Sequence, residues 1–109
     1  MTVWATTVQR GIAFAIGCGR MSLDSRSAAP PTDAIGATVM VSATGSIIGC
    51  ATLTGVITIA GPVLWVFERG LLFGKPIAVD EGEGELWPVP QSLHEKLRSA
   101  YREARERRS

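Results

Sequence analysis

The amino-acid sequence predicts an all-α membrane protein that lacks an independent globular core. The first observation is the segment Ala34–Phe67, which carries no charged side chain. A helix of about 20 apolar residues already crosses the ~30 Å hydrocarbon core of a bilayer. The second observation is that the flanks of this segment are short and polar, and chains below ~40 residues rarely build a core without help. The third is a C-terminal pattern typical of an amphipathic helix.

Residues 1–24 are expected to form an amphipathic helix that lies at the membrane interface. Apolar residues recur there at helical spacing, at Trp4, Val8, Ile12 and Ile16. Arg10 would fall near the middle of a membrane span, which costs roughly 2.5–3.5 kcal/mol. An interfacial or partner-packed helix is therefore favoured over a crossing one. No acid precedes Asp24, as in organellar transit peptides, so we interpret the helix as a retained targeting-like segment.

The membrane segment, residues 34–67, follows a Pro- and Ser-containing linker over residues 25–33. One straight helix would extend about 50 Å, which is too long for a perpendicular span. Gly61-Pro62 indicates a break, so we expect one tilted helix to Ala60 and then an interfacial end anchored by Trp65. A tight hairpin that turns near residues 45–49 is the alternative. Thr, Val and Ile favour strands in water, but the segment lacks two-residue alternation, and lipid does not tolerate an open sheet edge.

Small residues along this segment predict a packing face for other transmembrane helices. Spacings of three and four residues place them on one helix face, at Thr38, Ser42, Gly45, Gly49 and Thr52. Transmembrane helices associate through close backbone approach across small residues, because lipid tails are as apolar as leucine. This face is the predicted contact with neighbouring subunits.

Residues 68–91 are expected to form an extended, acidic and Pro-rich arm. Asp80, Glu81, Glu83 and Glu85 do not match the spacing of an EF-hand, so they are interpreted as a solvated turn. Trp87 lies beside Pro88 in a polyproline-like stretch and would anchor the arm on a partner.

Residues 92–109 are predicted to form an amphipathic helix. Ser92 and Glu95 make a capping box. Three apolar residues at helical spacing would dock this helix on a partner: Leu93, Leu97 and Tyr101. Basic residues are concentrated towards the C-terminal end, where the helix dipole favours cations.

The composition argues against catalysis and against bound cofactors. Cys18 and Cys50 match neither a disulfide framework nor a metal site, and His94 is the only histidine. No nucleophile–base pair or phosphate-binding loop is visible. A net charge of +1 provides no global field for nucleic acid. We therefore expect a protein that is not an enzyme and has no cofactor, metal, nucleic acid or small-molecule substrate.

These features predict a non-catalytic accessory subunit of a large membrane complex. The Arg-containing, acid-poor N-terminus favours the mitochondrial inner membrane, and hence a respiratory-chain complex of electron transport. The partners would be other membrane subunits and the lipid bilayer. The alternatives are a self-associating small pore or holin-like protein, and a small subunit of a photosynthetic complex or a protein translocase. The sequence leaves the membrane orientation and the particular complex open.

Overall fold

The long uncharged segment forms three β-strands and not a membrane helix. The computed structural model describes residues 2–58 and 60–108 of the chain. The elements are β1 (Trp4–Thr7), α1 (Arg10–Gly17), β2 (Leu23–Arg26), η1 (Thr32–Ala34), β3 (Thr38–Ala43), β4 (Ser46–Thr58), β5 (Val63–Ala78), β6 (Trp87–Pro88), η2 (Gln91–Leu93) and α2 (His94–Arg108). No helix among these residues has the length and apolar content needed to cross a bilayer. The predicted all-α membrane fold is therefore wrong.

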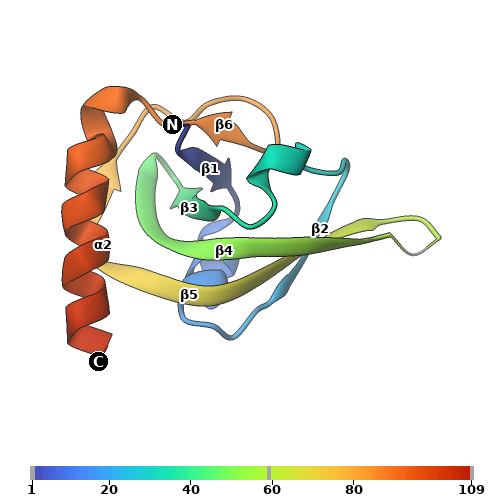
Figure 1. The fold of residues 1–109 in the computed structure, drawn as a ribbon, viewed down its shortest axis with the longest axis horizontal. Coiled ribbons are helices and arrows are strands. Elements are labelled where there is room, and N and C mark those ends of the chain that lie inside the picture. Colours follow the sequence, from blue (N-terminus) through green and yellow to red (C-terminus); the bar gives the residue numbers. More distant parts are fainter. Residues whose placement is uncertain (1, 59, 109) are drawn as a thin grey trace.

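The six strands form one mixed sheet in the order β2-β5-β4-β3-β1-β6. β1 runs parallel to β3, and the other neighbouring pairs are antiparallel. Figure 1 shows α2 standing across one end of β4 and β5, while the β4–β5 hairpin extends away from it. The parallel pair places the N-terminal strand in the sheet beside β3, far from β2 in strand order.

Both faces of this sheet are covered, which explains why its strands are apolar without alternation. Two apolar clusters lie on opposite faces of the sheet, and neighbouring residues of β3 belong to different ones. Met40 packs under α2 with Leu97. Val39 and Val41 pack on the other face, with Ile16 of α1. Successive side chains of a strand point to opposite faces, and strands buried on both faces therefore appear as continuous hydrophobic segments. An uncharged stretch of this kind has the composition of a membrane span.

The small residues that were predicted to line a helix face lie instead on two strands and the turn between them. Thr38 and Ser42 belong to β3, Gly45 to the turn, and Gly49 and Thr52 to β4. Thr38 pairs directly with Thr52 across the ladder. Thr44 and Gly45 both have positive φ angles, 48° and 80°, as a tight two-residue hairpin turn requires.

Glycine permits a close backbone approach at two places in the sheet. A Cβ atom at Gly49 would collide with the carbonyl oxygen of Leu71 on β5. A Cβ atom at Gly70 would collide with the carbonyl oxygen of Ile16, at the end of α1. The first contact lies within the sheet, between β4 and β5, and the second brings α1 directly onto it. The segment 1–24, which the sequence predicted to be one interfacial helix, instead contains β1, α1 and the first two residues of β2.

The two tryptophans that were predicted as interface anchors are buried in the protein. Trp65 is 0% exposed, and its indole Nε1 donates a hydrogen bond to the Ala28 carbonyl oxygen at 2.9 Å. Trp87 is 2% exposed, and its Nε1 donates to Thr7 Oγ1 at 2.9 Å. The predicted arm over residues 68–91 begins inside β5 and ends beyond β6, so most of its first half is sheet.

The helix predicted over residues 92–109 coincides closely with α2. Leu97 is buried against the sheet, whereas Leu93 and Tyr101 are partly buried at its edge. The apolar side of α2 therefore packs on the protein's own sheet.

Candidate functional site

The side of α2 next to its buried face, which holds Leu97 and Ala104, carries a stripe of basic and aromatic side chains. A helix turns about 100° per residue, so positions 94, 98, 101, 102 and 105 fall within an arc of about 100°. These positions hold His94, Arg98, Tyr101, Arg102 and Arg105. The three arginines are exposed, while the histidine and the tyrosine are partly buried. We call this set the basic stripe.

Two adjoining hollows follow the basic stripe. The first, the arginine hollow, has a volume of about 450 Å³ and is lined by Arg98, Tyr101, Arg102, Arg105 and Glu106. The second, the strand hollow, has a volume of about 620 Å³ and is lined by Val3, Thr38, Met40, Gln91, His94, Leu97, Arg98 and Tyr101. Arg98 and Tyr101 line both hollows, so the two form one groove between α2 and the start of β1 and β3.

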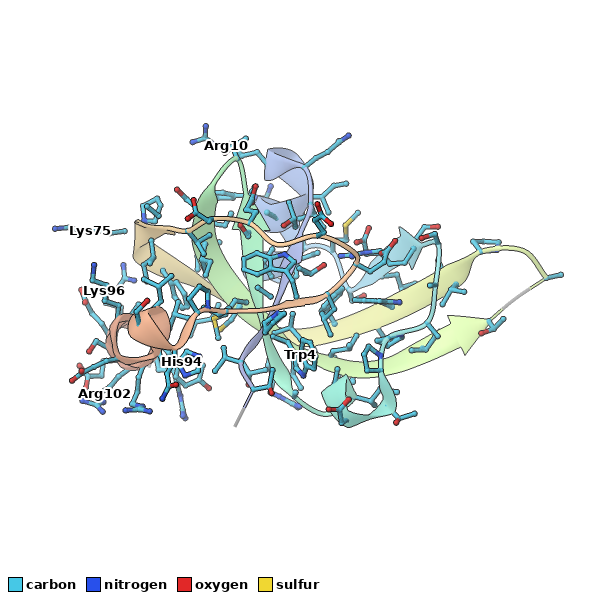
Figure 2. The ribbon with its side chains drawn as sticks, turned by 90° about the horizontal axis from the view of Figure 1, so that it is seen from above. Trp4, Arg10, Lys75, His94, Lys96 and Arg102 are labelled. Atoms are coloured by element: carbon cyan, nitrogen blue, oxygen red, sulfur yellow. The ribbon has the colours of Figure 1, made fainter. Side chains whose placement is uncertain are left out.

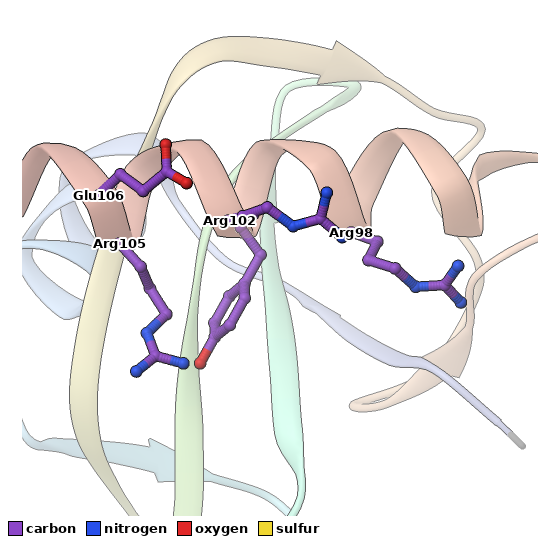
Figure 3. Close-up of a pocket in the computed structure, with 5 residues that line it drawn as sticks. Arg98, Arg102, Arg105 and Glu106 are labelled. Carbon is purple, nitrogen blue, oxygen red and sulfur yellow. The ribbon is translucent and has the colours of Figure 1, made fainter.

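The charge of the groove comes from side chains that extend on one side of α2. In Figure 3, Arg98 and Arg102 extend in the same direction along the helix. The Arg105 side chain extends below the helix in this view, whereas the Glu106 carboxylate lies near its upper edge. The guanidinium carbon of Arg105 lies 5.7 Å from the centre of the Tyr101 ring. Figure 2, which looks nearly along α2, shows Lys96 on a different side of the helix from Arg102. Positive charge is therefore concentrated beside an aromatic ring.

A second polar cluster, the Arg26 centre, is buried at the far end of β1. Arg26 Nε donates to Asp24 Oδ2 at 2.6 Å, and Nη1 donates to Thr6 Oγ1 at 2.7 Å and to Glu85 Oε2 at 3.1 Å. Its guanidinium carbon lies 4.6 Å from the centre of the Trp65 ring. Since β2 and β1 are near opposite edges of the strand order, this contact shows that the sheet curls around its α1 face.

The Arg26 centre fixes the acidic segment that precedes β6. Ser27 Oγ donates to Glu85 Oε1 at 2.6 Å, and the hydrogen bonds from Ser27 and Arg26 lower the pKa of Glu85 from its ordinary value despite partial desolvation. Glu81 accepts a hydrogen bond from the hydroxyl of Ser42, which is fully buried. Two of the four acids that were interpreted as a solvated turn thus hold this segment to the sheet. Arg26 Nη2 is buried without a hydrogen-bond partner among the described residues.

The two cysteines do not come together. Cys18 is exposed at the end of α1, and Cys50 is buried in β4, where desolvation raises the pKa of its thiol to about 12. Within the described ranges, no group of three or more His, Cys, Asp or Glu side chains is arranged to hold a metal ion.

The sequence interpretation missed both clusters. It recorded the concentration of basic residues near the C-terminus, but it selected the apolar positions of α2 as the site. Leu93 and Leu97 pack towards the sheet, and of these three predicted residues Tyr101 alone lines both hollows. The helical spacing of positions 98, 102 and 105 was the available signal. The Arg26–Glu85 pair joins residues 59 apart in the chain, so no local pattern marks it.

The chain was compared with known proteins. No protein-family model matches it, and no curated protein sequence matches it. Among solved structures, ASCH from Zymomonas mobilis superposes with a TM-score of 0.72 over 90% of this chain and 94% of that chain, at 15% sequence identity. A tyrosine-to-phenylalanine variant of the same protein gives a TM-score of 0.73 over 91% of this chain and 98% of that chain, also at 15% identity. The chain folds like ASCH.

The ASCH-like fold overturns the functional prediction made from the sequence. A membrane-complex subunit, whether respiratory, photosynthetic, translocase or pore-forming, required residues 34–67 to span a bilayer as a helix. That segment instead contains β3, β4 and the start of β5, in a fold that superposes on ASCH. The predicted subunit role, the predicted membrane partners and the location in the mitochondrial inner membrane are therefore wrong. At 15% identity, the likeness to ASCH establishes the fold and leaves function to the site itself.

Proposed function

We propose that this protein is a non-catalytic binding module whose basic stripe holds the sugar–phosphate backbone of a nucleic acid strand. The observation that carries the proposal is the convergence of Arg98, Arg102 and Arg105 with Tyr101 in one groove. Nucleic-acid-binding surfaces combine cations that track the phosphates with aromatic rings on which bases stack. Arginine suits phosphate because its planar guanidinium donates two parallel hydrogen bonds.

A nucleic acid fits the stripe better than an anionic membrane surface does. Helices that lie on membranes insert an apolar face between the lipids. The apolar face of α2 is already occupied, since Leu97 and Ala104 are each 3% exposed against the sheet. The exposed side of α2 offers guanidinium groups beside a hollowed surface, which matches a linear polyanion.

The proposal is tested by removing two arginines of the stripe together. The Arg98→Ala/Arg102→Ala double variant should bind a fluorescein-labelled uridine 12-mer at least about 10-fold more weakly at low salt. Each neutralised phosphate contributes about −0.7 to the slope of log K against log salt for single strands. The double variant should therefore lose about 1.4 of this slope, as measured by fluorescence anisotropy across a salt series.

Lys96→Ala is the matched control. Lys96 is an exposed cation of the same helix, about 160° around the axis from Arg98. The Lys96→Ala variant removes one positive charge outside the groove, so it should change the affinity for the uridine 12-mer by less than about twofold. Equal losses in the control and in the double variant would show only a general charge effect and would refute a binding site in the groove.

A further inference from the structure

We infer that the strand hollow receives one unstacked base of the bound strand, which makes the groove selective for single strands over duplexes. This inference rests on the proposed function, because the strand is first held by the basic stripe. Its basis is the difference between the two connected hollows. The arginine hollow presents guanidinium groups, whereas the strand hollow has a floor made of aliphatic side chains.

The floor of the strand hollow suits a flat apolar ring. It consists of Val3, Met40 and Leu97, of which Met40 is 7% and Leu97 3% exposed. Tyr101 and His94 form a wall along α2, and both belong to the basic stripe. The volume of about 620 Å³ lies in the ~300–1,000 Å³ range of small-molecule sites. A nucleobase stacked on Tyr101 would cover this floor.

The rim of the strand hollow carries groups that can contact the edge of a base. Among the described residues, neither the Thr38 hydroxyl nor the Gln91 amide makes a hydrogen bond within the protein, so both are open to a ligand. His94 Nε2 lies 3.2 Å from the Val89 carbonyl oxygen. A carbonyl oxygen only accepts, so Nε2 is the donor and the ring is held in place. Fixed polar groups around an apolar floor are the usual arrangement of a specific small-molecule site.

The junction of the two hollows connects base to phosphate. Arg98 and Tyr101 line both of them. A strand whose phosphates contact Arg98 and Arg102 can therefore turn one base over Tyr101 into the strand hollow. In a duplex the bases are stacked and paired, so extrusion of a base costs free energy that a single strand does not lose.

Two uridine 12-mers, one with all its bases and one fully abasic, separate the role of the base from that of the backbone. The wild-type protein should bind the base-bearing strand about 10-fold more tightly than the abasic strand. It should also prefer the single strand to the same strand annealed to its complement. Thr38→Phe, which fills the strand hollow from an exposed strand position, should reduce the affinity for the base-bearing strand to that for the abasic strand. It should leave abasic binding unchanged.

Ser99→Phe is the matched control, because Ser99 is exposed on α2 and lines a different hollow with Gly74 and Lys75. It adds the same ring to the other side of the helix and should leave both affinities unchanged. If thermal melting shows that Thr38→Phe does not fold, Gln91→Trp fills the same hollow from an exposed turn position.

The possible outcomes separate the two proposals. Equal wild-type affinity for the base-bearing and abasic strands would overturn the base pocket and leave backbone binding intact. The base pocket would also be overturned if Thr38→Phe or Gln91→Trp weakened binding of the base-bearing and the abasic strand equally. If the Arg98→Ala/Arg102→Ala variant binds both the base-bearing and the abasic strand as tightly as wild type does, the proposed function itself is overturned.

Discussion

Arg26 and Glu85 form an ion pair between a buried guanidinium group and a partly exposed carboxylate. The Arg26 side chain is 7% exposed, and that of Glu85 is 31% exposed. The hydrogen bonds from Ser27 and Arg26 favour the charged form of Glu85, which is why its pKa lies below the ordinary value. The contact stabilises the fold only while this carboxylate is ionised.

The pH dependence of stability follows from the direction of this shift. A carboxylate with a lowered folded-state pKa contributes stability above its unfolded pKa, near 4.5, and loses that contribution as the pH falls through the folded value. Glu85→Gln should therefore be less stable than wild type at pH 7, by about 1 kcal/mol after allowance for partial exposure. The difference should narrow towards pH 3, as measured by urea denaturation at each pH.

Glu83→Gln controls for the loss of a charge in the same segment, because Glu83 is exposed. It should follow the wild-type pH profile. If the free energy of unfolding of Glu85→Gln also runs parallel to that of wild type across the pH range, the charge of Glu85 does not hold the acidic segment to the Arg26 centre.

At the scale of elements, α1 depends on a glycine in the strand beneath it. Gly70→Ala would place a methyl group against the carbonyl oxygens of Ile16 and Gly17, which are backbone atoms and cannot rotate away. Overpacking of this kind typically costs 1–3 kcal/mol. We expect about 2 kcal/mol of lost stability, measured as a lower urea midpoint.

Gly11→Ala provides the contrast within α1 itself. A Cβ at Gly11 meets nothing within 4 Å, and alanine is favoured over glycine inside a helix by about 1 kcal/mol. This variant should be as stable as wild type or more so. A similar loss for both variants would mean that the close backbone approach at Gly70 is not the cause of the cost of Gly70→Ala.

Elements differ in how well the sequence predicts them. The C-terminal helix was found because α2 is covered on one side only, which leaves a periodic pattern of apolar and charged residues. Strands β3, β4 and β5 were missed because α1 and α2 cover opposite faces of the sheet and remove the alternation. The Val, Ile and Thr content of residues 34–67, and Gly45 in a tight turn, were the signals for strands. They were outweighed by the absence of charge.

At the scale of the whole molecule, the two apolar clusters share a single sheet. Trp65 belongs to the cluster under α1 and Trp87 to the cluster under α2. The radius of gyration, 12.9 Å, matches the ~13 Å of a compact chain of this length. Neither face can lose its packing without exposing the strands on which the other depends.

One cooperative unfolding transition should result. Tryptophan fluorescence reports both clusters, and far-UV circular dichroism reports the helices and the sheet. The urea curves from the two probes should coincide, as they do for small two-state domains. Separate transitions would mean that α2 and the cluster beneath it unfold independently of the remainder.

Whole-molecule charge was a poor guide to the candidate site. The net charge of +1 led to an expectation that nucleic acid is not a partner, yet α2 concentrates arginines within one arc of its surface. Glu106 is the acid that lines the arginine hollow, whereas Asp24 and Glu85 reduce the total charge from the Arg26 centre. Binding depends on local potential, which a sum over the chain does not report. The position of these acids depends on contacts between distant parts of the chain, which a sequence pattern does not show.

The place of β1 in the sheet also has a consequence for biosynthesis. This strand is translated before both of its neighbours, β3 and β6, and β6 lies far along the chain at Trp87–Pro88. Proteins are synthesised from the N-terminus at about 5–20 residues per second. One edge of β1 must therefore stay unpaired until β6 has been translated, and exposed strand edges are sites of aberrant association. The nascent chain is thus exposed to aggregation through this edge until β6 has been translated.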